Sequence, residues 1–306
     1  MKLMTLLFLA GTLAGCVSAG EPPGFDHLWN YSDPAASRAS FEKRLQEEQA
    51  RGDPAPGLRT QIARTYSLEG NFAEAHRILD RIRPELDTAG PEVKVRYLLE
   101  RGRTFRSAGK GDMALPLFRE ARAVALRQGP GYLAVDAIHM LAIAEKDSGK
   151  RAAYTREGIA LAKGAEDPRT RRWLGPLHNN LGWDLHGQRR YAKALIQFEQ
   201  ALDAYRKTGR SGRIFSARWA VARAQRSLGR TGAALAIQLD LLKEMDKTRP
   251  DGYVYEELGE LYLLNGEKER AGKYFGQAYQ ILSSDKWLLR NEPERLARLK
   301  RLSVRL

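Results

Sequence analysis

The sequence predicts an all-α protein, a solenoid of about six helix pairs with an extra helix before the first pair and a capping helix after the last. Small residues recur at intervals of about 40 positions along most of the chain. Large apolar residues follow these small residues at helical spacing, and no stretch shows the alternating pattern of a β-strand. A regular series of helical units that bury their apolar faces against neighbouring units is typical of a repeat array.

The first 15 residues have the pattern of an export signal. The apolar run Leu3 to Leu13 is too short to cross a bilayer, which needs about 20 residues. It ends in Leu13-Ala14-Gly15-Cys16, which resembles the lipobox of bacterial lipoproteins, in which a lipid-modified cysteine becomes the first residue of the mature protein. We therefore predict residues 1–15 as a lipoprotein-type signal peptide.

Cys16 is the only cysteine of the chain, so no internal disulfide and no cysteine-based metal site is expected. The lipobox resemblance implies that Cys16 carries lipid and that the chain is membrane-anchored. Ordinary secretory cleavage after Val17-Ser18-Ala19 remains the alternative, and it predicts a secreted periplasmic protein. Val17, rather than Asp, follows the cysteine, which resembles an outer-membrane address in lipoproteins sorted by that rule.

Residues 16–32 are predicted to be a tether and docking segment. Its glycines and prolines indicate an irregular chain, but Phe25, Leu28, Trp29 and Tyr31 are too apolar for a solvated linker and are expected to pack on the first helices. Asp33 and Pro34 have the pattern of an N-cap followed by proline at the first helical position, and the helix they begin is expected to end near residue 51.

Residues 33–290 are predicted to be the repeat array. In five copies a small residue on the first helix is followed twelve positions later by alanine on the second helix: Ala63 and Ala75, Gly102 and Ala114, Gly182 and Ala194, Ala222 and Ala234, Gly259 and Ala271. A sixth copy, Ala142 with Ala153, has a spacing of eleven. Five glycines are expected between paired helices in the left-handed conformation: Gly70, Gly109, Gly149, Gly229 and Gly266.

The clearest copy covers residues 177–202, in which Gly182 and Ala194 mark a close helix crossing and Leu185, Tyr191 and Phe198 fill the space around it. This pattern resembles the tetratricopeptide repeat (TPR), which implies a right-handed array of antiparallel helix pairs. The second-helix alanines are 37 to 41 residues apart, against 34 in the standard repeat, so we expect longer helices. Asn179-Asn180-Leu181-Gly182 matches a string that opens the first helix in long-repeat TPR proteins.

Residues 291–306 are predicted to be a capping helix, because Pro293 starts a stretch with Leu296, Leu299 and Leu302 at helical spacing. Its arginines leave contact with anionic lipid as an alternative.

The sequence gives little indication of catalysis. The five histidines form no metal-ligand pair, and no phosphate-binding or nucleophile motif is found, so we predict a non-enzymatic protein with no cofactor and no small-molecule substrate. The net charge of +14, with 36 Arg and 15 Lys, favours acidic partners. Nucleic acid would suit this charge, but the export signal argues against it.

The TPR resemblance implies that the first helices line a concave groove for a partner's polypeptide segment. Helical spacing from the small residues predicts its lining: Arg64, Arg103, Arg106, His139, Lys146, Asn179, Trp183, His186, Trp219, Arg223, Arg226, Glu256 and Glu260. The arginines are suited to carboxylates, the tryptophans to apolar side chains, and Asn179, by the resemblance, to a peptide backbone. Solvated charges and tryptophans packed between repeats are the alternative interpretation.

Two function classes stay open. The first is a membrane-anchored scaffold of the bacterial envelope that binds a partner protein, or an acidic segment of one, through a basic and aromatic groove. The second is a periplasmic binder of an anionic polymer or lipid headgroup that acts by charge. Both place the protein in the cell envelope, the first as an outer-membrane lipoprotein facing the periplasm.

Overall fold

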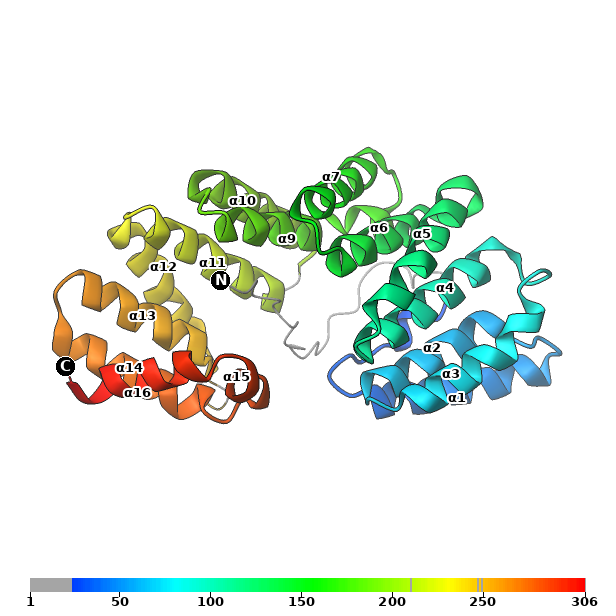
Figure 1. The fold of residues 1–306 in the computed structure, drawn as a ribbon, viewed down its shortest axis with the longest axis horizontal. Helices are drawn as coiled ribbons and strands as arrows, with labels where there is room; N and C mark the ends of the chain where they lie inside the picture. The colour runs from blue at the N-terminus through cyan, green and yellow to red at the C-terminus, as the bar shows by residue number, and fades with distance from the viewer. Residues whose placement is uncertain (1–23, 210, 247, 249, 306) are drawn as a thin grey trace. The chain divides into compact units, whose positions relative to one another are not determined.

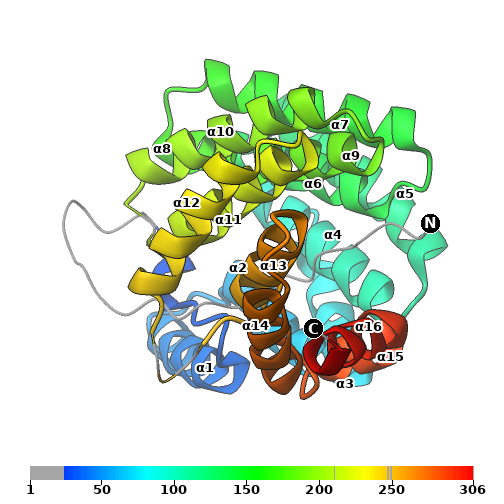
Figure 2. The same cartoon turned by 90° about the vertical axis from the view of Figure 1, so that its left-hand side faces the viewer.

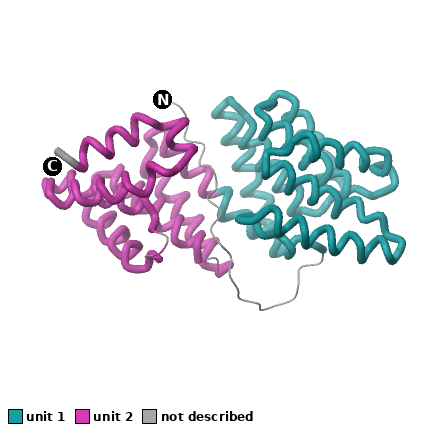
Figure 3. Tube along the Cα trace, turned by 90° about the horizontal axis from the view of Figure 1, so that it is seen from below, with its two compact units in different colours: residues 1–177 teal, residues 178–306 magenta. Residues whose placement is uncertain are grey.

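The computed structural model describes residues 24–209, 211–246, 248 and 250–305, so the predicted signal peptide and Cys16 lie outside the described residues. Within these ranges every regular element is a helix. The chain folds into two compact units, residues 1–177 and 178–306, and the boundary falls inside one helix, α9 (Figure 3). The sequence predicts one continuous repeat array over residues 33–290. We describe each unit by itself.

Unit 1 consists of an N-terminal helix followed by three helix pairs (Figure 1). Its elements are η1 (Asp26–Leu28), α1 (Pro34–Ala50), α2 (Pro56–Leu68), α3 (Phe72–Ile82), η2 (Arg83–Glu85), α4 (Gly90–Ser107), α5 (Gly111–Gln128), α6 (Gly131–Ala144), α7 (Ser148–Gly164) and α8 (Pro168–Arg171). The predicted start of α1 is confirmed, because the Asp33 side chain accepts a hydrogen bond from the Ala36 backbone N–H at 2.9 Å.

The pair α6 and α7 departs from the prediction. The first helix of this pair ends at Ala144, and Asp147 caps the second by accepting a hydrogen bond from the Lys150 backbone N–H at 2.7 Å. This early cap places Gly149 inside the first turn of α7, so the predicted left-handed turn at Gly149 is wrong. Lys146 lies in the loop between the helices, not on the first helix where the spacing predicts it.

Unit 2 contains most of α9 (Leu174–Gly187) and the helices that follow it. Its other elements are α10 (Tyr191–Lys207), α11 (Ser211–Ser227), α12 (Thr231–Glu244), α13 (Gly252–Leu264), α14 (Lys268–Leu282), α15 (Lys286–Asn291) and α16 (Pro293–Arg305). Several helices have 17 or 18 residues, among them α4, α5, α10 and α11, which confirms the longer helices expected from the repeat spacing.

The predicted helix crossings are confirmed by the packing around the small residues. A Cβ atom on Gly182 would lie 2.5 Å from the Phe198 ring, and Gly102 and Gly259 have the same relation to Phe118 and Phe275. These three phenylalanines and the second-helix alanines of the five regular copies are fully buried. The absence of a side chain on the first helix therefore makes room for an aromatic ring on the second.

The predicted capping helix is also confirmed. It forms α16, which begins at Pro293 and packs beside α14 (Figure 2). Leu296 and Leu299 are buried in the core of these helices. No helix among the described residues is both long and apolar enough to cross a membrane.

Candidate partner-binding faces

The predicted groove residues fall on two surfaces, one in each unit. We call the first the unit 1 face, carried by α2, α4 and α6, and the second the unit 2 face, carried by α9, α11 and α13. The unit 1 face contains Arg64, Arg103, Arg106 and His139. The unit 2 face contains Asn179, Trp183, His186, Trp219, Arg223, Arg226, Glu256 and Glu260. Lys146 belongs to neither: its side chain is 85% exposed, and it approaches the equally exposed Asp112 at 3.5 Å.

The unit 1 face is crossed by a chain of ion pairs that links three first helices. Arg64 on α2 lies 3.5 Å from Glu100 on α4, and Arg103 on α4 donates to Glu100 at 2.6 Å. Arg103 also donates to Asp136 on α6. Both carboxylates are largely buried, so each arginine neutralises a charge that would be costly to leave unpaired.

Arg106 adds a further positive charge to the unit 1 face, near Arg64. Burial lowers the pKa of Arg64 and of Arg106, and the two guanidiniums lie within electrostatic range of each other. His139 is only 6% exposed, and burial lowers its pKa to about 4, so it is neutral near pH 7 and has little surface to offer a partner.

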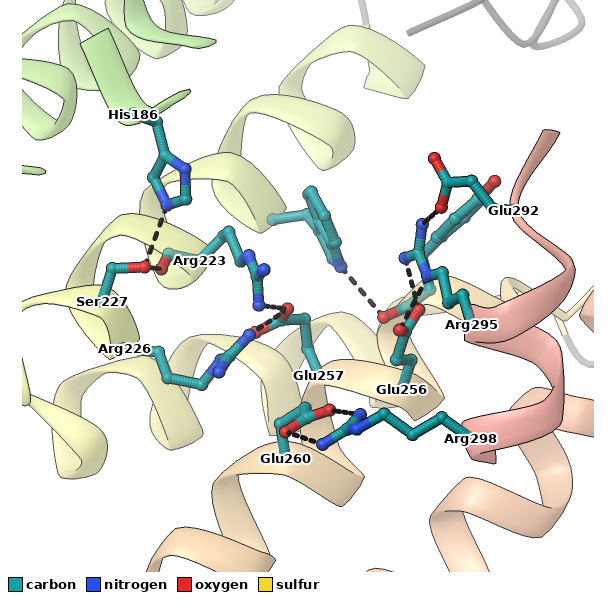
Figure 4. A network of polar contacts seen from close by, with 12 residues as sticks. His186, Arg223, Arg226, Ser227, Glu256, Glu257, Glu260, Glu292, Arg295 and Arg298 are labelled. Carbon is teal, nitrogen blue, oxygen red and sulfur yellow. Dashed lines mark hydrogen bonds and ion pairs between the residues drawn. The ribbon is translucent and has the colours of Figure 1, made fainter. Parts of the chain in front are cut away.

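The unit 2 face carries a second set of ion pairs (Figure 4). Arg223 and Arg226 on α11 both donate to Glu257 on α13, Arg223 through one hydrogen bond at 2.7 Å and Arg226 through two at 2.7 and 3.0 Å. His186 on α9 lies 2.9 Å from the Ser227 hydroxyl on α11. Adjacent first helices are therefore joined by side-chain bonds across the whole face.

The acidic end of the unit 2 face is paired with the capping helix. Arg295 on α16 forms a bidentate pair with Glu256 at 2.8 and 2.5 Å, and Arg298 forms another with Glu260 (Figure 4). Burial raises the pKa of Glu256, while Arg295 lowers it. These two arginines hold the cap in place, which supports the capping interpretation over contact with lipid.

Aromatic side chains form a row across the unit 2 face. The Trp183 ring lies 5.9 Å from that of Trp219, which lies 6.2 Å from that of Tyr253 on α13. The Trp219 indole N–H donates to the Tyr253 backbone oxygen at 3.1 Å. Both tryptophans are half-buried between neighbouring repeats.

The carboxylates that neutralise the arginines are absent from the residues predicted from the sequence. Glu100 and Glu257 each lie two positions before the small residue of their first helix, and Arg64 and Arg223 each lie one position after the small residue of the preceding repeat. This register places Arg and Glu opposite each other on successive first helices. The same alignment that predicts the arginines contains this signal, although it becomes visible only when one repeat is compared with the next.

The described residues contain no group of three or more histidine, cysteine, aspartate or glutamate side chains that could hold a metal ion. Unit 2 also has an open hollow of about 840 Å³, lined from α12, α13 and α14 by residues that include Tyr255, Tyr262 and Tyr274. Tyr274 stacks on the rings of Tyr255 and Tyr262, so these aromatic rings already contact one another within the protein.

Comparisons with known proteins agree with this architecture. The tetratricopeptide repeat family profile matches residues 179–208, which lie in α9 and α10. A tetratricopeptide repeat protein from Parabacteroides merdae is 14% identical with a TM-score of 0.53, over 89% of this chain and 93% of that chain. No curated protein matches at a significant level.

Two solved structures of longer chains contain similar helix arrays. One is a Signal Transduction ATPase with Numerous Domains with a tetratricopeptide repeat sensor, from Pyrococcus horikoshii, at 15% identity and a TM-score of 0.66 over 88% of this chain and 44% of that chain. The other is the APC/C hetero-tetramer Cut9-Hcn1, at 18% identity and a TM-score of 0.60 over 88% and 48%. The predicted fold class, an all-α TPR-like solenoid, is confirmed.

Proposed function

We propose that this protein is a non-catalytic, lipid-anchored scaffold of the bacterial envelope that binds an extended segment of a partner protein on its unit 2 face. The observation that carries the proposal is the row of half-exposed side chains on successive first helices: Asn179, Trp183, His186, Trp219 and Arg223. TPR-type solenoids bind protein partners, and an extended peptide can contact several first helices at once.

The paired charges change the expected chemistry of the partner. Glu257 pairs with both Arg223 and Arg226 and offsets one of their two positive charges, so this face is less basic than its arginines alone suggest. Arg223 nevertheless uses one hydrogen bond to Glu257 and keeps about a third of its side chain exposed. Because a guanidinium has five N–H donors, Arg223 can bind a partner carboxylate without releasing Glu257. We therefore expect a segment that combines a carboxylate with apolar side chains.

The test is affinity capture from crosslinked envelopes with three forms of the full chain. The variant Asn179→Ala with Arg223→Gln removes polar contacts of the unit 2 face, while Arg226 keeps Glu257 paired. Arg206→Gln, at an exposed position on α10, is the matched control. We expect the first variant to lose the captured partner and the control to keep it. Equal capture by all three forms would exclude the unit 2 face as the binding surface.

The ion pairs argue against a charge-only binder. A protein that holds an anionic polymer by charge loses affinity steeply and log-linearly as salt rises. We expect partner capture to depend on single residues of the unit 2 face. It should change little when the salt concentration rises from about 50 to about 200 mM. A steep slope together with indifference to Asn179 and Arg223 would favour the anionic-polymer alternative.

Membrane attachment is proposed from the lipobox at residues 13–16. Several acyl chains on Cys16 would give effectively permanent attachment, because each buried CH₂ contributes about 0.8 kcal/mol. Replacing Cys16 by serine should move the protein from the membrane fraction to the soluble fraction. Unchanged fractionation, or a mature N-terminus after Ala19 in mass spectrometry, would reject lipidation.

A further inference from the structure

The unit 1 face is covered in part by the chain's own residues 25–29, which we call the N-terminal segment. The Phe25 ring packs against the first turn of α2 and against Arg96 on α4: a Cβ atom added to Gly57 would lie 3.5 Å from it, and the Arg96 guanidinium stands 4.9 Å from its centroid. Asp26 accepts two hydrogen bonds from Arg96, at 3.2 and 3.3 Å. The segment thus supplies an aromatic ring and a carboxylate to consecutive first helices.

The other end of the N-terminal segment makes the same kind of contact. The Trp29 indole N–H donates to the Gln61 side chain on α2 at 3.1 Å, and its ring meets Phe41 edge-on at 5.0 Å. Tyr31, just beyond the segment, stacks on Trp29 with ring centroids 4.7 Å apart. Tyr31 itself is 57% exposed.

Among the described residues, the contacts that hold the segment on this face come from side chains. The backbone hydrogen bonds of residues 25–29 stay within the segment, from Leu28 N–H to Phe25 O and from Trp29 N–H to Asp26 O. A fixed point follows at Asn30, whose backbone N–H donates to the Ser37 hydroxyl and whose backbone oxygen accepts from it, both at 2.8 Å. Residues 25–29 can therefore leave the face by rotation about Asn30 without breaking a shared backbone ladder.

Release of the segment leaves no buried charge unpaired. Arg96 is 6% exposed and, besides Asp26, donates to Glu92 at 3.1 Å and to the Tyr132 hydroxyl at 2.7 Å. The Tyr132 hydroxyl in turn donates to Glu92 at 2.8 Å. Because Arg96 keeps these partners, loss of Asp26 removes one ion pair and does not carry the penalty of an isolated buried guanidinium.

The apolar contacts set what can replace the segment. Phe41 and Leu58 are almost fully buried, and Phe25 and Trp29 cover them from the outer side. Exposure of this apolar surface to water would be unfavourable. A replacement must therefore bring aromatic rings of its own as well as a carboxylate for Arg96.

We propose that residues 25–29 are an internal ligand of unit 1, and that a partner peptide with an aromatic residue next to a carboxylate displaces them. The segment contains this combination as Phe25-Asp26, followed by Trp29 three positions later. A short tether gives the segment an effective concentration in the millimolar range. An incoming peptide must therefore bind tightly enough to compete with the tethered segment. The inference rests on the proposed role of first-helix faces in peptide binding, but it concerns unit 1.

The test uses a labelled synthetic peptide with the sequence of residues 24–31 and the full chain. In the release variant, Phe25→Ala, Asp26→Asn and Trp29→Ala remove the side chains that hold the segment. We expect this variant to bind the peptide at least ten-fold more tightly than the wild type, since the internal competitor is gone. The added substitution Arg96→Gln, or a peptide with asparagine in place of the aspartate, should abolish the gain.

A release variant with native helix content that binds the peptide no better than the wild type would overturn the proposal and make the segment a permanent cap. If the variant does not fold, hydrogen exchange of the wild type decides the question. Excess peptide should accelerate exchange at residues 25–29 while α2 stays protected; exchange only through global unfolding contradicts displacement. The variants at Asn179 and Arg223 do not touch unit 1, so failure of the proposed partner site and failure of this inference can be told apart.

Discussion

Arg189 occupies a backbone position that glycine fills in four other helix pairs. Gly70, Gly109, Gly229 and Gly266 end the first helix of their pairs with φ between 76° and 81°, and Arg189 does so with φ of 59°. All five lie seven positions after the small residue of their first helix. The turn is therefore imposed by the helix pair, and arginine accepts a conformation that glycine adopts with less strain.

Replacing Arg189 by glycine should stabilise the protein. Relief of left-handed strain exceeds the extra flexibility of glycine in the unfolded chain, for a net gain of about 0.5 to 1 kcal/mol, or on the order of 2 °C in Tm. Arg190→Gly is the matched control, because Arg190 has φ of −88° and gains nothing from the change. Thermal melts of the two variants check the prediction, and equal or opposite shifts would contradict it.

His139 makes unit 1 sensitive to acid. Burial lowers its pKa to about 4, from about 6.5 in an unfolded chain. The stabilising effect of keeping it neutral is complete above pH 6.5 and is lost as pH falls from there toward 4. Between pH 7 and pH 5 the loss from this residue is roughly 2 kcal/mol.

Denaturant unfolding of the wild type and of His139→Gln at pH 7 and pH 5 tests this linkage. The difference in unfolding free energy between the two proteins should shrink, by roughly 2 kcal/mol, on acidification. The comparison cancels the contributions of His76 and His186, whose pKa values burial also lowers. A difference that stays constant with pH would show that His139 is not buried in its neutral form.

At the scale of helix pairs, the crossings were predictable because close contact between the two helices requires small residues at fixed positions in the five regular copies. A second-helix phenylalanine fits only where the facing residue is small, so the twelve-residue spacing can be read directly. The ion pairs between repeats could not be read this way, because they depend on the register between successive first helices, which brings Arg64 to Glu100 and Arg223 to Glu257. The errors at Lys146 and Gly149 have a local cause: α6 already ends at Ala144, and the cap at Asp147 starts α7 at Ser148.

Gly182→Ala measures how tight one crossing is. The added methyl would lie 2.5 Å from the Phe198 ring, so the ring or a helix must move, and we expect a loss of about 1 to 3 kcal/mol. Gly232→Ala on α12 is the control, since no atom lies within 4 Å of its added methyl and alanine favours a helix. Chemical denaturation that finds both substitutions neutral would contradict the assigned crossing.

At the scale of the whole molecule, the sequence pattern predicts a run of repeats, while the packing separates two compact units within α9. In a repeat array each repeat interacts only with its neighbouring repeats. The free energy of local unfolding can therefore differ from one part of the chain to another. The N-terminal segment and the capping helix illustrate this, because each closes one end of the array with contacts to the adjacent helices.

We expect a core substitution in one unit to loosen that unit first. Leu99→Ala on α4 removes a side chain that is 1% exposed and should cost about 2 to 5 kcal/mol, accelerating hydrogen exchange in α4 to α6 while α13 and α14 keep their protection. Leu258→Ala on α13, at a fully buried position, is the reciprocal variant and should accelerate exchange in α13 to α16 only. Equal loss of protection across residues 24–305 in both variants would show one cooperative unit, because only global unfolding exposes all helices together.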